Sequence, residues 1–433
     1  MMVFRLAVRG SRDRREVRFF GRCAVLAVLS VSLALISTAD CQEGGIIEVL
    51  FIGDPFMRPG FPTPALVEDP KIRLTPVVGE LAFVTRKEMA KAMRIYLPRT
   101  QKHLSENHDL VALAAIRSDH LSGAFHSWVA TGVLEGELAL LMADDPVSFA
   151  GVDAWEGAGA PGWMETPVGA ILPVDDRTRI NYEDIWFKFK PASGYEDHPF
   201  NTGIPWEQVT VNTHNRPTAR PGATVLMETS QETPFSGYGG PVQEGSPVVV
   251  FWDIEMGRSM ALVFDWGGNG VTEFYRWEYW RDIVARWFYL PARAEILEDV
   301  ALSHKVRQMI AQFGVQKGIT LSMLEFADKF GANTVRVEEH LAMVNEDRRK
   351  ADSLWIEGDF QGCGTAMETA LAGLQEVEGE ALKAKDDALL WIYISEWTAV
   401  SGTLCVTGFV VWSLMIRRVA YREVGTTRSG PSN

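Results

Sequence analysis

One segment near the C-terminus limits what this chain can fold into more than any other. Trp397 begins an uncharged run of 20 residues, WTAVSGTLCVTGFVVWSLMI, which ends at Ile416. A helix of about 20 apolar residues matches the roughly 30 Å hydrocarbon core of a bilayer. Trp397 and Trp412 lie near its two ends, where indole rings favour the membrane interface. The run predicts one transmembrane helix over residues 397–416, with a buried helix of a soluble protein as the alternative interpretation.

A short basic tail, residues 417–433, follows this run. Its four arginines outnumber its one acidic residue, Glu423. Because cytoplasmic flanks of membrane helices carry the excess of Lys and Arg, we expect this tail in the cytoplasm. The chain is therefore expected to cross the cell membrane once, with its body outside the cytoplasm and its C-terminus inside.

The N-terminal segment, residues 1–39, has the pattern of an export signal. Seven arginines and two acidic residues precede an apolar run from Cys23 to Ile36, and Ser37-Thr38-Ala39 then supplies small residues for cleavage. The apolar run is short for a spanning helix. An uncleaved anchor is the alternative for this segment. A lipid-modified Cys41 is a further alternative, although Asp40 fits such a site poorly.

Composition excludes several classes of protein. The 433 residues carry a net charge of −14, which argues against a nucleic-acid binder because such a protein needs cations to neutralise phosphates. The hydrophobic content of 47% is that of a globular protein rather than a disordered one. The four cysteines have scattered spacings that fit neither a disulfide framework nor a zinc ribbon. No nucleic-acid partner is therefore expected.

Residues 45–293 show an α/β pattern. Short apolar runs at 46–53, 109–116 and 138–143 are typical of buried parallel strands, and helical periodicity lies between them at 86–107 and 120–134. Strands at 247–252 and 259–265 are expected to form a hairpin. This alternation predicts a flavodoxin-like, doubly wound parallel sheet. The Gly- and Pro-rich residues 150–247 are expected to form long loops with short strands.

Residues 294–390 have an almost wholly helical pattern. We expect one helix beginning near Leu297, a shorter one ending at Gly331, a third over 335–355, and a fourth from Gln361 into Leu390. No helix breaker separates the last of these from the apolar run. The segment is therefore expected to be a helical hairpin or stalk that carries the α/β domain.

Candidate ligand-binding residues follow from the topology. In open α/β sheets, ligands bind beyond the C-terminal ends of the parallel strands. The polar residues expected at that edge are Asp54, His120, Asp144, Asp145 and Ser148. Carboxylates there suit a polar ligand or a hard cation such as Ca²⁺, although no metal site is assigned. In the alternative interpretation, Asp144 and Ser148 only cap the following turn through hydrogen bonds to the backbone.

A search for cofactor and catalytic motifs is largely negative. The sequence has no phosphate-binding G-x-x-x-x-G-K-[ST], no H-E-x-x-H and no G-x-S-x-G. Residues 157–162 match G-x-G-x-x-G, but they follow no expected strand and include Pro161, so we expect a flexible loop there. No cofactor is expected.

The order of motifs in the α/β region resembles a known superfamily. Arg58–Pro70 follows the first strand, Asp109-Leu110-Val111 opens the second, and Leu140–Phe149 closes the third. Gly162-Trp163 and Leu172-Pro173-Val174 come next. This order resembles the putative glutamine amidotransferase-like proteins of the class I glutamine amidotransferase-like superfamily, including membrane-anchored members with a helical tail.

The resemblance implies a catalytic cysteine after the third strand, activated by a histidine. Residues 142–149 contain no cysteine, and after signal cleavage only Cys41, Cys363 and Cys405 remain. Glutamine hydrolysis by the mechanism of that superfamily is therefore not expected. The resemblance concerns the fold, and a fold alone does not establish a function.

Two hypotheses of function follow. In the first, a non-catalytic amidotransferase-like domain acts as a binding or assembly module for protein partners at the cell envelope, with the strand-end crevice or the aromatic stretch 274–289 as contact surface. In the alternative, the protein is an envelope hydrolase or sugar-modifying enzyme. That enzyme would use Asp144, Asp145 or His120 as general acid–base groups.

Overall fold

The computed structural model describes residues 45–55, 61–79, 84–144, 148–155, 158–176, 186–212, 215–233, 242–265 and 273–427. The expected signal segment 1–39, Asp145 and residues 428–433 lie outside this part of the chain. Asp144 is described by its backbone alone.

An eight-stranded mixed sheet forms the centre of the N-terminal part, in the order β2-β1-β3-β4-β14-β13-β12-β9. Neighbours from β2 to β14 are parallel, and those from β14 to β9 are antiparallel. The strands span Ile47–Gly53 (β1), Ile72–Val78 (β2), Leu110–Ala114 (β3), Ala139–Asp144 (β4), Phe189–Pro191 (β9), Thr224–Thr229 (β12), Pro247–Ile254 (β13) and Gly257–Asp265 (β14). The predicted α/β fold with a parallel core is confirmed.

Burial explains why most of these strands could be recognised in the sequence. Every residue of β3 is buried, so the strand is an uninterrupted apolar run. The edge strand β2 has no counterpart in the sequence-based expectations, because exposed Arg73 and the internal Pro76 obscure its pattern. Proline is tolerated there since an edge strand leaves one row of backbone N–H groups unpaired.

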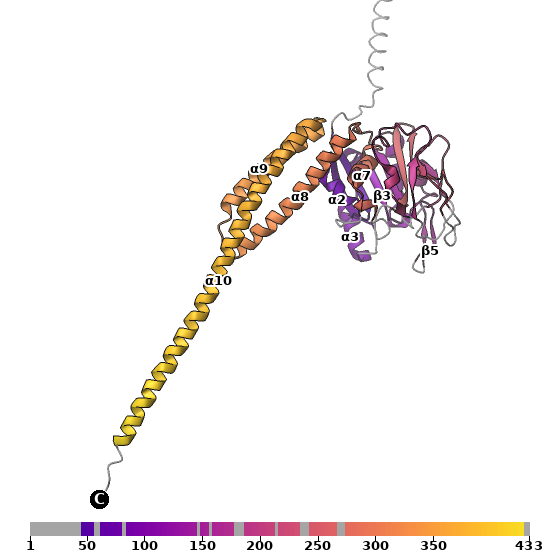
Figure 1. The fold of residues 1–433 in the computed structure, drawn as a ribbon. Coiled ribbons are helices and arrows are strands. Elements are labelled where there is room, and N and C mark those ends of the chain that lie inside the picture. The colour runs from indigo at the N-terminus through magenta and orange to yellow at the C-terminus, as the bar shows by residue number, and fades with distance from the viewer. Residues whose placement is uncertain are drawn as a thin grey trace, which may run out of the picture.

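Helices cover both faces of the sheet (Figure 1). One face packs against α2 (Thr63–Glu68) and α7 (Trp280–Tyr289). The other face packs against α3 (Arg86–Tyr96), α4 (Gln101–Asn107), α5 (Gly123–Leu134) and α6 (Pro167–Ile171). The helix expected over 86–107 is interrupted as Pro98 predicts, and Thr85 begins α3 with a capping box to Glu88.

In the part of the chain that the structure describes, the connecting segments form three small two-stranded sheets and three 3₁₀ turns. The 157–162 segment, expected as a flexible loop, instead contributes β6 to a hairpin with β5, which corrects that expectation. The elements are β5 (Gly151–Trp155), β6 (Ala158–Pro161), β7 (Val174–Asp175), β8 (Trp186–Phe187), β10 (Val211–Asn212), β11 (Thr218–Ala219), η1 (Ser118–His120), η2 (Trp206–Gln208) and η5 (Phe274–Arg276).

Three long helices follow the α/β part: α8 (Val300–Lys329), α9 (Val335–Glu357) and α10 (Phe360–Thr427). The two helices expected before Gly331 are one continuous helix, α8, so that expectation was wrong. Gly314 and Gly318 lie inside α8 and each weakens a helix by about 1 kcal/mol. Packing of buried side chains such as Phe313 and Leu324 against α9 and α10 offsets this cost.

Helix α10 is 68 residues long and runs without interruption from the three-helix packing through the apolar run. At 1.5 Å per residue it extends about 100 Å, and Figure 1 shows its C-terminal part projecting alone beyond α8 and α9. Among the described residues it is the one helix long and apolar enough to cross a membrane, and none of its most apolar window is buried by the rest of the chain. Side chains such as Leu404, Val406 and Phe409 are more than 60% exposed.

Candidate functional site

The described strand-end residues chosen from the sequence lie near the C-terminal edge of the parallel strands. Asp54 follows β1 and is partly buried, and His120 ends η1 after β3. The His120 Nδ1 atom lies 3.1 Å from the carbonyl oxygen of Gly79. The hydroxyl of Ser148, which is 2% exposed, donates to the carbonyl oxygen of Ala143 at 2.9 Å. Ser148 therefore bonds to the backbone, but to the end of β4 rather than to the turn that follows it.

Backbone and aromatic groups pack closely over this edge. The indole Nε1 of buried Trp163 donates to the carbonyl oxygen of Ile116 at 3.0 Å, and its ring centroid lies 5.1 Å from that of His126. Burial lowers the pKa of His126, which favours its neutral form. The Ser118 hydroxyl donates to the carbonyl oxygen of Pro161 at 3.0 Å. These contacts hold the 161–163 segment against the ends of β3 and η1.

The aromatic stretch 274–289 is part of the core. Trp287 is 1% exposed and Trp280 is 9% exposed, and the Phe274 ring stacks on Trp287 with centroids 5.3 Å apart. A helix buried in this way offers few side chains to a partner. The structure therefore does not support α7 as the contact surface proposed from the sequence.

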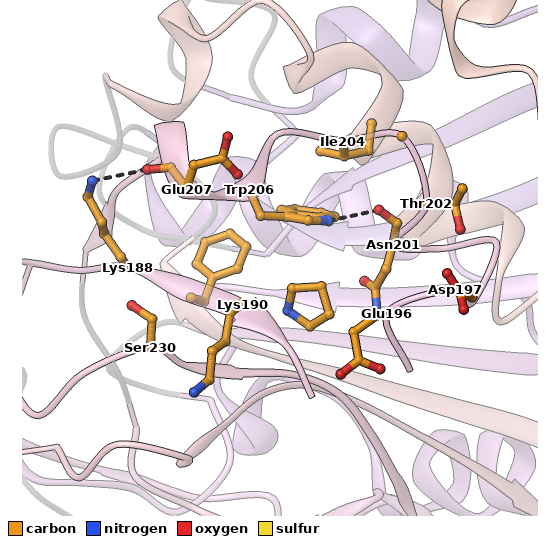
Figure 2. Close-up of a pocket in the computed structure, with 13 residues that line it drawn as sticks. Lys188, Lys190, Glu196, Asp197, Asn201, Thr202, Ile204, Trp206, Glu207 and Ser230 are labelled. Carbon is orange, nitrogen blue, oxygen red and sulfur yellow. Dashed lines mark hydrogen bonds between the residues drawn. The ribbon is translucent and has the colours of Figure 1, made fainter. Parts of the chain in front are cut away.

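A cavity of about 460 Å³ opens beside β9, the edge strand farthest from β2. It lies between this strand and residues 196–207. Its floor is apolar, formed by Phe189, Ile204 and Trp206, which are all less than 9% exposed. Figure 2 shows Lys188, Lys190, Glu196 and Glu207 around this floor. The volume and the mixture of an apolar floor with a few polar groups are typical of small-molecule sites.

The two lysines of the cavity already have partners. The Lys188 Nζ donates to the backbone carbonyl oxygen of Glu207 at 3.0 Å. The Lys190 Nζ lies 3.1 Å from Glu244 Oε1 and 3.6 Å from Glu228 Oε1. The hydrogen bond to Glu244, aided by the charge of Glu228, raises the pKa of Lys190. Both ammonium groups therefore already make hydrogen bonds or ion pairs within the protein.

Asn201 is the unusual residue of the cavity wall. It is 3% exposed, and its Nδ2 donates to the backbone oxygens of Tyr195 at 2.8 Å and Leu226 at 3.1 Å. Its Oδ1 has no hydrogen-bond partner. An unsatisfied buried polar atom costs about 1–3 kcal/mol, so a donor that reached this oxygen would be favoured. In Figure 2, Asn201 lies between Trp206 and Glu196.

This cavity has no counterpart in the sequence-based expectations. Its walls come from a three-residue strand and from residues that looked like Gly- and Pro-rich loops. The only local signal was the alternation Lys188-Phe189-Lys190-Pro191, which is too short to assign a strand.

A second buried polar cluster joins α8 to the α/β part. The Arg307 Nη2 atom lies 3.0 Å from Asp69 Oδ2, and the Tyr289 hydroxyl donates to the same carboxylate at 2.8 Å. The Arg307 guanidinium also lies 4.8 Å from the ring centroid of Trp355 on α9. Burial acts to lower the pKa of Arg307, but the charges of Asp69 and Asp282, with the hydrogen bond to the Tyr289 hydroxyl, outweigh it and raise that pKa. The cluster fixes the helical part to the sheet.

Within the described residues, no group of three or more His, Cys, Asp or Glu side chains is arranged to hold a metal ion. The two cysteines in that part of the chain, Cys363 and Cys405, both lie on α10, away from the sheet. Burial raises the pKa of Cys363 to about 11, so its thiol is protonated at neutral pH.

No family model matches the sequence, and no curated protein matches it significantly. Solved structures with a similar fold include the cytoplasmic protein STM1381 of Salmonella typhimurium LT2, at 17% identity and a TM-score of 0.42, over 57% of this chain and 99% of that one. A ThuA-like protein of Parabacteroides merdae ATCC 43184 shares 11% identity at a TM-score of 0.34, over 59% and 93%. A beta-galactosidase from Bacillus circulans sp. alkalophilus shares 10% identity at 0.31, over 60% of this chain and 33% of that one. The similarity is one of fold, and it identifies no substrate or activity.

Proposed function

We propose that this protein is a membrane-anchored, non-catalytic binding module. An α/β domain of the amidotransferase-like kind is held outside the cytoplasm at the cell envelope, where it binds a partner or ligand. The observation that carries the proposal is the cavity beside β9, whose wall contains the unpaired Oδ1 of Asn201.

The anchor in this proposal is the C-terminal part of α10. Ala388 is the last residue of α10 buried by the rest of the chain, and the apolar run begins nine residues later at Trp397. Nine residues of helix span about 13 Å. The helical packing would therefore stand close to the lipid head groups, and the arginines after Ile416 favour a cytoplasmic C-terminus.

The proposal that the domain is non-catalytic rests on two points: the cysteine that the resemblance implies is missing, and a hydroxyl at the strand ends is bonded to the backbone. Residues 142–149 contain no cysteine, and the Ser148 hydroxyl is hydrogen-bonded to the backbone. The alternative, an envelope hydrolase or sugar-modifying enzyme, would need Asp144, Asp145 or His120 to act as acid–base groups.

Anchoring is tested by alkaline carbonate extraction of membranes that contain the full chain. We expect the full chain to remain in the pellet and a chain truncated after Leu390 to be released. Protease added outside the membrane should digest the body and spare an epitope at the C-terminus. Release of the full chain by carbonate would exclude the anchor.

Binding at the cavity is tested by photo-crosslinking in the native membrane. A benzoylphenylalanine at Glu207, on the cavity wall, should give a discrete adduct. The matched control places the same group at Lys102 of α4, which covers the opposite face of the sheet. Equal adducts from both positions, or none from Glu207, would contradict the proposal. Hydrolysis of an amide or glycoside that is lost on Asp144→Asn would favour the enzyme instead.

A further inference from the structure

We infer that the cavity beside β9 binds an organic ammonium group carried on a short apolar body; this inference rests on the proposed binding function. Three features of the cavity point to this class of ligand: its negative charge, its unpaired acceptor and its apolar floor.

The charge around the cavity is negative. Three of its lining residues are acidic, and two further carboxylates, Glu228 and Glu244, reach Lys190 from outside the lining. Lys188 keeps its charge while it donates to a backbone oxygen, and Lys190 is shared between the two outer carboxylates, so five carboxylates face two ammonium groups and the balance stays negative. Among the described residues, Asp197 and Glu207 form no ion pair through their carboxylates, and the Glu196 carboxylate accepts only the N–H of Gly194. An anionic ligand is therefore disfavoured and a cation is attracted.

The unpaired acceptor is independent of that charge. The Oδ1 of Asn201 is buried and has no donor, while its Nδ2 is fixed by two backbone carbonyl oxygens. These two bonds fix the orientation of the amide and leave its oxygen as the open acceptor. A ligand that brings an N–H donor would satisfy this oxygen, and an ammonium group has three such donors.

The apolar floor indicates that the part of the ligand beyond its ammonium group is apolar. Phe189, Ile204 and Trp206 give an apolar surface beneath the acidic rim. Methylene groups lose water when they pack on such a surface, and a cation close to an aromatic ring gains a further attraction. A short alkyl amine fits this combination, whereas a fully hydroxylated ligand would leave the floor without an apolar partner.

The test uses the full chain purified in detergent and three probes with the same five-carbon length. These are 1,5-diaminopentane, 1,5-pentanediol and glutarate, which differ in charge. Isothermal titration calorimetry in 150 mM salt should give at least tenfold tighter binding for the diamine than for the other two. Equal affinity for the diamine and the diol, or no detectable binding of the diamine, would overturn the inference.

A matched pair of triple variants tests whether the diamine binds at the cavity or is attracted by the overall negative charge of the protein. Glu196→Gln with Asp197→Asn and Glu207→Gln should weaken diamine binding at least tenfold. The control changes three acids of α9 by the same charge: Glu339→Gln, Glu346→Gln and Asp347→Asn. It should alter binding less than twofold. Equal weakening in both variants would show nonspecific attraction and overturn the inference.

The two proposals can fail separately. If the photo-adduct at Glu207 forms but the diamine does not bind, the binding function stands and the ligand class is wrong. If neither is observed, the cavity is not a binding site.

Discussion

The guanidinium of Arg307 on α8 and the carboxylate of Asp69, just after α2, form a buried ion pair with an Nη2–Oδ2 distance of 3.0 Å. Their side chains are 10% and 4% exposed, so water contributes little to their solvation. Tyr289 donates to the same carboxylate, which leaves Asp69 with partners from both α7 and α8. This pair connects the long helices to the domain that contains the cavity.

Arg307→Met should strongly destabilise the fold. Removal of one partner of a buried ion pair leaves an uncompensated charge, which costs about 3–5 kcal/mol. We expect thermal unfolding of the full chain in detergent, followed by circular dichroism, to begin at a clearly lower temperature. The control is Arg349→Met, an arginine of α9 whose side chain is 75% exposed, with an expected effect of about 0.5 kcal/mol or less. Equal melting of the two variants would contradict this role for Arg307.

The same region predicts a pH dependence through His304. Its Nδ1 lies 2.7 Å from Asp282 Oδ2, and this hydrogen bond, together with Glu278, raises the pKa of His304 above its ordinary value of 6.5. Folding therefore favours the protonated form. The stabilisation is fully present below about pH 6.5 and is lost as the pH rises through the raised pKa.

His304→Gln should accordingly destabilise the protein more at pH 6 than at pH 9. The measurement is the difference in melting temperature between the native chain and the variant across that range. His103→Gln, at an exposed position on α4, serves as the control and should give a small difference. A larger difference at pH 9 than at pH 6 would have the wrong sign for this mechanism.

The parts of the fold that could be predicted are those where burial leaves a simple pattern. Strands β1, β3 and β4 are buried on both faces and therefore appear as continuous apolar runs. Strand β2 could not be found in this way because Pro76 and Arg73 are compatible only with its edge position, which depends on tertiary structure. The continuity of α8 through Gly314 and Gly318 likewise depends on packing against α9 and α10.

The candidate site was harder to predict than the fold. The topology rule placed His120 and Ser148 at the C-terminal ends of the parallel strands, where the structure has them, but their hydrogen bonds to Gly79 and Ala143 depend on turn geometry. Phe149, next to Ser148, has a positive φ of 49°, which no sequence pattern indicated. The cavity beside β9 arises from segments that meet only in the folded chain.

Ser148→Ala distinguishes a structural from a catalytic serine. Loss of the hydrogen bond to Ala143 should cost about 1 kcal/mol, because one buried acceptor loses a donor. We expect a slightly lower melting temperature and unchanged diamine affinity in the calorimetric titration. Unchanged stability together with loss of a measured hydrolytic activity would instead identify Ser148 as part of a reacting site.

Two glycine variants should have effects of opposite sign, for reasons given by their surroundings. Gly53 ends β1 with a φ of 140°, and an added Cβ would lie 1.5 Å from the carbonyl oxygen of Ala114. Gly53→Ala therefore combines backbone strain with a clash that requires β1 and β3 to separate, and it should cost about 3 kcal/mol or more.

Gly318 lies inside α8, and a Cβ there would meet nothing within 4 Å. Gly318→Ala should stabilise the helix by about 1 kcal/mol, since alanine has less backbone freedom to lose than glycine. Melting temperatures that fall for Gly53→Ala and rise for Gly318→Ala would confirm both environments, whereas a fall for Gly318→Ala would show that its surface is packed against something in solution.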